Sequence, residues 1–191
     1  MLKKTKIILL SFLAIITFTA VLLAQKPKTS KEHLFIETDY GTIEIAFYPD
    51  KAPKHVEAIK KLANEGFYDG IRFHRVIPNF MIQGGDPTSK DPTKRHLHGT
   101  GGPGFNIEAE FNDVSHKRGI CSMARSQDPN SAGSQFFICV ADCPFLDRKY
   151  TVWGNVVDGM DVADKIVALQ RDHNDNPIVN STMNKVYIKE V

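Results

Sequence analysis

Residues 72–86 place an arginine within an apolar, strand-like run, and this segment has the most evident capacity for chemistry. Met81 and Gln83 alternate with apolar neighbours in the period-two pattern of a β-strand. Pro78 predicts a bend before them, because proline cannot donate to a sheet ladder. Arg75 is costly to place in such a run unless it has partners or a function. The residues alone therefore leave two readings, an arginine paired with a carboxylate at a strand end or a cation that acts on a ligand.

Nucleophilic chemistry is not supported by the other reactive residues. Ser134 lacks the G-x-S-x-G context of a nucleophile elbow. Cys139 lies on an apolar strand, where a thiol is usually inert packing. Cys139 and Cys143 are separated by three residues, so they do not form a redox C-x-x-C motif, although a bridge between them stays open in an oxidising compartment.

Residues 87–105 form a predicted loop with two motifs that could indicate a nucleotide site or a metal site. The glycines between 99 and 104 match G-x-G-x-x-G formally, but no strand directly precedes them and no amphipathic helix follows, so we exclude a dinucleotide site. A glycine loop that borders a binding groove is the preferred interpretation. His96 and His98 have no further ligands at metal-binding spacing, so we predict neither a metal nor a cofactor.

Hydrophobic periodicity and turn residues predict a mainly β domain that would position these residues. A helix should begin at the Pro49–Pro53 segment and run to about Asn64, with Val56, Ile59 and Ala63 on its buried side. A second helix should be capped by Asp158 and bury Met160, Ala163, Ile166 and Val167. The expected strands span residues 33–38, 42–48, 72–77, 80–83, 120–124, 135–140, 151–157 and 186–191. Spacing alone fits a sandwich and a barrel equally well.

Charge is distributed unevenly along the 191 residues, whose formal net charge is +2. Residues 1–32 hold six of the 24 basic side chains and one of the 22 acidic ones, which leaves 18 basic and 21 acidic groups in the remainder. A slightly acidic body argues against non-specific nucleic-acid binding, which needs a basic face.

The N-terminal region resembles a targeting segment. Three lysines precede an apolar run at residues 7–24, the pattern of a secretory signal or a short membrane anchor. The residues before Ala20 and Ala24 do not make a good cleavage site, so cleavage and retention both stay open. We expect a signal or anchor at residues 1–24, a polar linker at 25–32 and a folded domain at 33–191. The protein is then exported to the periplasm or cell envelope, with membrane contact only through residues 7–24.

Two segments of the domain resemble the signature of the cyclophilin family of peptidyl-prolyl cis-trans isomerases (rotamases). The resemblance covers about residues 35–191. The residues that carry it are Phe73, His74, Arg75, Pro78, Phe80, Met81, Gln83, Gly84, Gly85 and Asp86, followed by Gly133, Ser134, Gln135, Phe136 and Phe137.

This resemblance implies a closed eight-stranded antiparallel barrel capped by two α-helices. It implies catalysis of rotation about Xaa-Pro bonds in unfolded or extended polypeptides by a monomer that assists folding, with Arg75 stabilising the twisted amide. Phe80 and Gln83 complete the expected catalytic set. The expected substrate-binding residues are Met81, Gly99, Ala124, Arg125, Ser126, Gln135, Phe137, Phe145, Leu146 and Tyr150.

Three positions depart from the pattern of many family members. Phe145 stands in place of Trp, Tyr150 in place of His and Arg125 in place of Asn. These changes resemble the prokaryotic branch of the family. Because the indole N–H donates to cyclosporin, we expect only weak cyclosporin binding. Two other functions remain open from the sequence: a binding module that holds proline segments without relevant turnover, and a cysteine or metal enzyme.

Overall fold

The computed structural model describes residues 27–191, so the predicted signal or anchor at residues 1–24 lies outside the described part of the chain. Across residues 27–191, no helix is long and apolar enough to span a bilayer. The domain is built on one antiparallel sheet of eight strands with the order β3-β4-β6-β5-β7-β2-β1-β8. The strands are β1 Glu32–Thr38, β2 Gly41–Phe47, β3 Arg75–Ile77, β4 Met81–Gly84, β5 Ile120–Met123, β6 Phe136–Cys139, β7 Val152–Asp158 and β8 Met183–Glu190.

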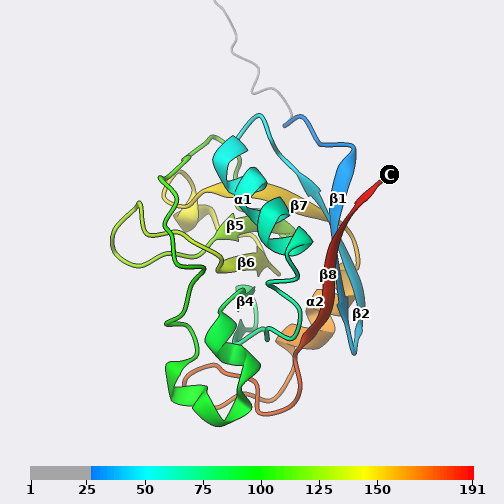
Figure 1. Ribbon diagram of the computed structural model, residues 1–191, viewed down its shortest axis with the longest axis vertical. Coiled ribbons are helices and arrows are strands. Elements are labelled where there is room, and N and C mark those ends of the chain that lie inside the picture. Colours follow the sequence, from blue (N-terminus) through cyan, green and yellow to red (C-terminus); the bar gives the residue numbers. More distant parts are fainter. Residues whose placement is uncertain (1–26) are drawn as a thin grey trace, which may run out of the picture.

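The sheet is strongly curled rather than closed into the barrel that was predicted. In Figure 1, β1, β2 and β8 run steeply on one side, whereas β5 and β6 run across the view. Its edge strands β3 and β8 do not form a ladder with each other. Residues 70–73 approach β8 through a single bridge between Arg72 and Thr182 and a few backbone bonds, such as Met183 N–H to Ile71 O at 2.8 Å. β3 itself is only three residues long.

Apolar alternation explains which side of the sheet is buried. Leu34 and Ile36 of β1 are fully buried, as are Ile43 and Ile45 of β2, so both strands direct one face inward. Trp153 on β7 lies at the centre of this core, with ring centroids 5.8 Å from Phe47 and 5.7 Å from Phe136. Burying these rings supplies much of the apolar contact that holds the curled sheet together.

Helix α1, Pro53–Asn64, packs over the concave side and is capped from a distant loop. Pro53 stands at its start, where a missing N–H costs nothing. The carboxylate of Glu110 accepts hydrogen bonds at 3.1 Å from the N–H groups of Lys54 and His55. The predicted buried face is confirmed for Val56, Ile59 and Ala63, and Leu62 and His55 join it.

Helix α2, Met160–Val167, buries Ala163, Ile166 and Val167 as predicted, although Met160 is only partly buried. The predicted Asp158 cap is wrong, because the N-cap residue is Gly159 at φ 86°. A Cβ at that position would lie 2.2 Å from the Thr42 carbonyl oxygen. Close approach to β2 therefore selects glycine at this position.

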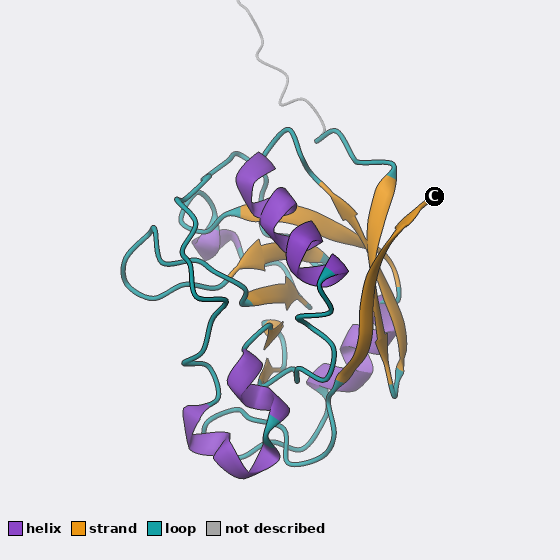
Figure 2. Cartoon of the chain, in the orientation of Figure 1, coloured by secondary structure: helices purple, strands orange, loops and turns teal. Residues whose placement is uncertain are grey.

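The predicted loop after β4 contains two 3-10 helices, η1 Pro87–Lys90 and η2 Pro92–Leu97, and a third, η3 Pro144–Leu146, precedes β7. Figure 2 shows η1 and η2 together at the lower end of the molecule. Each is started by an aspartate that precedes a proline: Asp86 accepts from Thr88 N–H at 2.7 Å and Asp91 from Thr93 N–H at 2.9 Å. The repeated Asp-Pro-Thr sequence was the available signal for both.

Candidate active site

The β3–β4 hairpin places Arg75 directly opposite Gln83 on the sheet. The predicted bend between the strands is confirmed, because Asn79 has φ 60° and Phe80 N–H donates to Ile77 O at 3.1 Å. A left-handed residue is needed to reverse the chain in so short a connection, and asparagine tolerates that conformation. Arg75 Nη1 lies 3.5 Å from Gln83 Oε1, so the pairing of the strands also brings the two side chains together.

Next to this pair lies an apolar slot of about 170 Å³. Met81 and Phe137 form its floor from β4 and β6, and Leu146 contributes from η3; all three are more than nine-tenths buried. Beneath the floor, Cys139 and Cys143 belong to the same buried cluster. The residues that line the slot are Arg75, Phe80, Met81, Gln83, Ala124, Arg125, Phe137, Leu146 and Tyr150.

The Arg75 guanidinium is not fixed in a strong ion pair. Its Nε lies 4.0 Å from Asp175 Oδ2, whereas Asp175 is held more closely by Arg171 Nε at 3.1 Å. With Gln83 at 3.5 Å, both contacts of Arg75 are long for hydrogen bonds. A guanidinium carries five N–H donors, so Arg75 keeps donors for a ligand in the slot. The ion pair between Arg75 and a carboxylate, which was one of the two readings of the sequence, is therefore present only as a marginal contact with Asp175.

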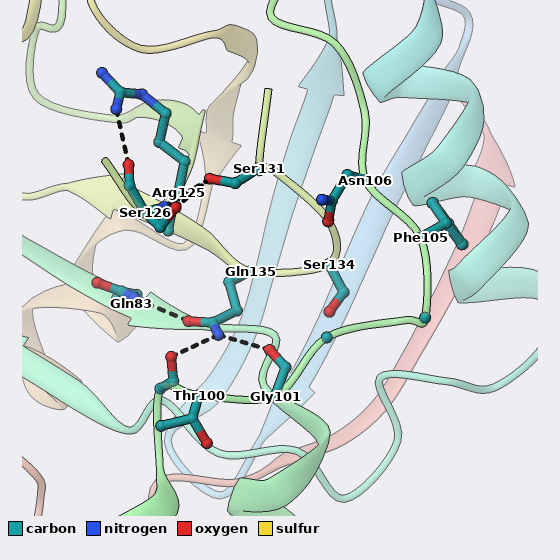
Figure 3. Close-up of a pocket in the computed structure, with 15 residues that line it drawn as sticks. Gln83, Thr100, Gly101, Phe105, Asn106, Arg125, Ser126, Ser131, Ser134 and Gln135 are labelled. Carbon is teal, nitrogen blue, oxygen red and sulfur yellow. Dashed lines mark hydrogen bonds between the residues drawn. The ribbon is translucent and has the colours of Figure 1, made fainter. Parts of the chain in front are cut away.

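A polar chain links Arg75 to the glycine loop. Gln83 Nε2 donates to Gln135 Oε1 at 3.1 Å, and Gln135 Nε2 donates to the carbonyls of Gly99 and Gly101 at 3.0 and 2.8 Å. Figure 3 shows Gln135 between Gln83 and this loop. Gln135 therefore orients Gln83 from one side while holding the glycine loop in place from the other.

The buried carboxylate of Asp86 anchors the opposite side of the same loop. It accepts hydrogen bonds from Thr88 and from the N–H of Gly99. Burial of this carboxyl favours its neutral form, but the hydrogen bonds from Thr88, Gly99 and Gly101 outweigh burial and lower its pKa. The loop is thus held by an ionised side chain underneath.

The loop borders a second, larger cavity of about 780 Å³ that adjoins the slot. As Figure 3 shows, Ser126, Ser131 and Gln135 face it from one side and Thr100 and Gly101 from the other. The predicted glycine loop therefore lines a cavity, and its role in binding substrate stays a prediction. Sequence reasoning missed Phe105, Asn106 and Ser131 as lining residues, since nothing in their local pattern marks a groove.

The predicted site residues fall into three groups. Nine line the slot, as given above. Gly99, Ser126 and Gln135 line the larger cavity, which shares Gln83, Ala124 and Arg125 with the slot. Phe145 lines neither cavity; it is 60% exposed and packs on Phe80 with ring centroids 5.5 Å apart. The structure thus brings together residues that lie up to 75 positions apart in the sequence.

Ser122, His116 and the partly exposed Asp147 have the composition of a hydrolase triad, yet they cannot act as one. His116 Nδ1 lies 3.0 Å from Asp147 Oδ1 and its Nε2 lies 3.1 Å from Ser122 Oγ. Both Ser122 and His116 are fully buried, and the Ser122 hydroxyl donates to Thr151 O at 2.8 Å. The His116 ring stacks on Phe137, so the set supports the floor of the slot.

The cysteines and His98, which the sequence offered as reactive or metal-binding residues, are buried or hydrogen-bonded within the fold. Cys121, Cys139 and Cys143 are free and buried, and burial raises the pKa of each thiol. His98 is bonded at both ring nitrogens, to Asp91 O at 3.1 Å and to Asn176 Nδ2 at 2.9 Å. In residues 27–191, no group of three His, Cys, Asp or Glu side chains is arranged to hold a metal.

His74, the neighbour of Arg75, gives the domain a predictable pH dependence. Its ring is 4% exposed and neither nitrogen completes a hydrogen bond. Burial, with smaller effects of His98 and Arg75, lowers its pKa from 6.5 to about 4, against the opposing charge of Asp86. The folded protein therefore keeps His74 neutral where the unfolded chain takes up a proton, so stability is lost as the pH falls from about 6.5 towards 4.

We expect the free energy of unfolding of the wild type to fall by about 2–3 kcal/mol more between pH 7 and 4.5 than that of His74→Gln. Urea titrations at several pH values measure this difference. His55 and His116, whose pKa values are also lowered chiefly by burial, are present in both proteins and cancel. Parallel pH profiles for the two proteins would contradict the assignment to His74.

Comparison with known proteins is consistent with this geometry. A family model described as "Cyclophilin type peptidyl-prolyl cis-trans isomerase/CLD" matches residues 33–188. A Brucella abortus protein named "Probable peptidyl-prolyl cis-trans isomerase" is 52% identical over 130 residues, which is 66% of this chain and 66% of that protein. The match thus spans just under two thirds of the length of the Brucella protein. Peptidyl-prolyl cis-trans isomerase B of Bacillus subtilis is 45% identical over 135 residues, covering 70% of this chain and 88% of that protein.

Solved structures show the same similarity. A cyclophilin type peptidyl-prolyl cis-trans isomerase of Cryptosporidium parvum superposes with a TM-score of 0.76 at 29% identity, covering 84% of this chain and 98% of that one. The same protein crystallised in the presence of the dipeptide Ala-Pro also gives 0.76, at 30% identity with 83% and 99% coverage.

Proposed function

Because this chain belongs to the family of cyclophilin-type peptidyl-prolyl cis-trans isomerases, we propose that it accelerates rotation about Xaa-Pro bonds in polypeptides by Arg75 stabilisation of the twisted amide. One observation carries the proposal: an incompletely hydrogen-bonded guanidinium lines the same small cavity as a floor of apolar side chains. That is the pairing of groups that this reaction requires.

Rotation about an Xaa-Pro bond is slow because it breaks amide resonance, at a cost of about 18–20 kcal/mol. No covalent bond forms or breaks, so a nucleophile, base or metal is not required. The enzyme must bind the twisted amide more tightly than either planar form. Lowering the barrier by about 7 kcal/mol would accelerate the rotation roughly 10⁵-fold.

Arg75 provides charge where the twisted state needs it. As the bond rotates, the proline nitrogen becomes pyramidal and regains its lone pair, to which a guanidinium N–H can donate. A second N–H of the same planar group holds the carbonyl oxygen of the proline. Gln83, fixed by Gln135, restricts the position of Arg75, so little reorganisation is needed as the transition state forms.

The slot and the larger cavity hold the substrate on the two sides of the rotating bond. The proline ring is bound by Phe80, Met81 and Phe137. The backbone N–H of Ala124 is already used, because it donates to Gln135 O at 2.9 Å. The carbonyl of Ala124 is therefore the group that we assign to pairing with the extended backbone of the substrate. Fixing the ring while the preceding residue turns is how binding energy is directed to the transition state.

The proposal is tested by a cis-to-trans assay on a proline peptide with the full-length chain. We expect catalysis that is proportional to protein concentration and saturates with peptide. A rate equal to that of the uncatalysed reaction at micromolar protein would contradict it.

A second function, holding extended segments without relevant turnover, is supported by the size of the larger cavity, about 780 Å³. The Arg75 variants described in the Discussion separate the two.

We also propose that the protein acts as a monomer in the periplasm or cell envelope, on exported chains whose folding is limited by proline isomerisation. This step takes tens of seconds unaided. Support for export comes from the apolar run at residues 7–24 and the lysines before it. Fractionation of cells, followed by mass measurement of the exported chain, tests export and shows whether the segment is cleaved.

Cyclosporin should inhibit this protein only weakly. Phe145 lacks the indole N–H that the resemblance associates with cyclosporin binding, so the inhibition constant should lie well above the nanomolar range. Phe145→Trp restores that donor and should tighten inhibition about three- to tenfold. Phe145→Leu, which adds no donor, is the control and should not tighten it. Nanomolar inhibition of the wild type in a peptide assay would contradict the expectation.

A further inference from the structure

The charges that line the groove point to a substrate preference. The slot and the larger cavity contain two cations, Arg75 and Arg125. A third cavity of about 400 Å³, which shares Arg75 and Gln83 with the slot, adds Arg95 and three histidines. Among the described residues, none that lines these three adjoining cavities is an aspartate or a glutamate. This contrasts with the domain as a whole, which carries more acidic than basic groups.

Four aspartates outside the lining are buried or have partners of their own. Asp172 pairs with Arg95 at 2.9 Å and so offsets one of the cations named above, whereas Asp175 pairs with Arg171 and only marginally with Arg75. Asp86 is fully buried beneath the glycine loop. Asp128, in the loop after Arg125, accepts from Asn130 N–H at 2.9 Å. Within residues 27–191, Arg125 therefore has no ion pair and Arg75 has only the 4.0 Å contact with Asp175, whereas the charge of Arg95 is offset by Asp172.

Of the two cations that line the slot, Arg125 is held more firmly than Arg75. Its guanidinium donates to Lys149 O at 2.9 Å and to Ser126 O at 2.8 Å, and Figure 3 shows the second of these bonds. It also stacks 4.6 Å over the Tyr150 ring. Because Tyr150 in turn packs edge-on against Phe137 in the floor of the slot, the charge has a fixed place relative to a bound proline.

Arg125 lines both the slot and the larger cavity, so it stands at the boundary between the proline and its neighbour in the chain. The carbonyls it binds do not neutralise it, and its four hydrogen bonds use at most four of its five N–H donors, so one donor has no partner within residues 27–191. An acidic side chain next to the proline would therefore meet a preorganised cation.

We propose that Arg125 is a specificity-determining residue that selects proline segments with an aspartate or glutamate beside the proline. The inference rests on the proposed isomerase function and names the substrate class of the same groove. It is distinct from catalysis, because Arg125 acts on the flanking side chain and Arg75 acts on the rotating amide.

Matched peptides that differ only by Glu or Gln at the residue before or after the proline test this proposal. For each pair, kcat/KM and the dissociation constant of a fluorescent version are measured, with the uncatalysed rate of each peptide subtracted. At low salt the wild type should favour Glu over Gln about three- to fivefold at one of these positions. The preference should fall towards one in 1 M salt, where charges are screened beyond about 3 Å.

Arg125→Gln should abolish that ratio, whereas Arg125→Lys should keep part of it. Lys61→Gln, which removes an exposed cation from helix α1 outside the groove, should leave it unchanged. An arginine with a purely structural role would weaken Glu and Gln peptides equally when replaced. A wild-type ratio near one at both positions, or a ratio that survives in Arg125→Gln, would overturn the proposal. Because the dissociation constants do not depend on turnover, a Glu preference in binding without catalysis would count against the proposed function alone.

Discussion

Arg75→Ala is expected to lower kcat/KM for peptide isomerisation by about 10³-fold, equivalent to about 4 kcal/mol of transition-state stabilisation. The reason is that the Arg75 guanidinium lines the slot and is the group to which the proposed mechanism assigns donation to both the proline nitrogen and the carbonyl. Its contacts with Gln83 and Asp175 are long, so removing it leaves no buried charge without a partner. The fold should therefore remain intact, which a thermal unfolding curve checks.

Arg75→Lys is the matched control for charge. It keeps the cation but loses the planar fork, so we expect activity between those of the wild type and the alanine variant. Peptide affinity should change less than about tenfold in both variants, because the apolar floor that binds the proline is untouched. Retention of activity within threefold in Arg75→Ala would favour the binding-module function.

Gly85→Ala should destabilise the domain by more than about 3 kcal/mol, a large stability effect for the addition of one methyl group. Gly85 has φ 92°, a conformation that costs other residues about 1–2 kcal/mol. In addition, a Cβ there would lie 2.2 Å from Ser134 O and 2.9 Å from Gln135 Cα. Because both of these are backbone atoms, the clash cannot be relieved by rotating a side chain.

Urea unfolding of Gly102→Ala provides the comparison for Gly85→Ala. A Cβ at Gly102 would meet no atom within 4 Å, although the residue belongs to the same glycine-rich region. We expect a change of less than about 1 kcal/mol there. Equal effects at both glycines would mean that backbone entropy, and not the approach of β4 to β6, determines the need for glycine at position 85.

The parts of the fold that sequence predicted correctly are those with local causes. Proline and asparagine define the β3–β4 bend, and the apolar spacing of Val56, Ile59 and Ala63 defines the buried face of α1. The adjacency of Arg75 and Gln83 follows from pairing across a short hairpin. Each of these depends on residues within about ten positions of one another.

What could not be predicted depends on contacts that are distant in sequence. Asp175 reaches Arg75 from a polar loop 100 residues away, and no periodicity marks its role. Glu110 caps α1 from 56 residues away, and the open edge between β3 and β8 reflects how the whole sheet curls. The cation–π stack of Arg125 on Tyr150 joins two loops in the same way.

The most direct test of the central claim is exchange NMR on a proline peptide held near saturation by the protein, with wild type and Arg75→Ala compared at equal bound fractions. Our account predicts cis–trans exchange cross-peaks within a sub-second mixing time for the wild type. It predicts their loss in Arg75→Ala, while the peptide still shifts residues of the slot on binding. Cross-peaks of equal intensity with both proteins would contradict the claim that this guanidinium stabilises the twisted amide.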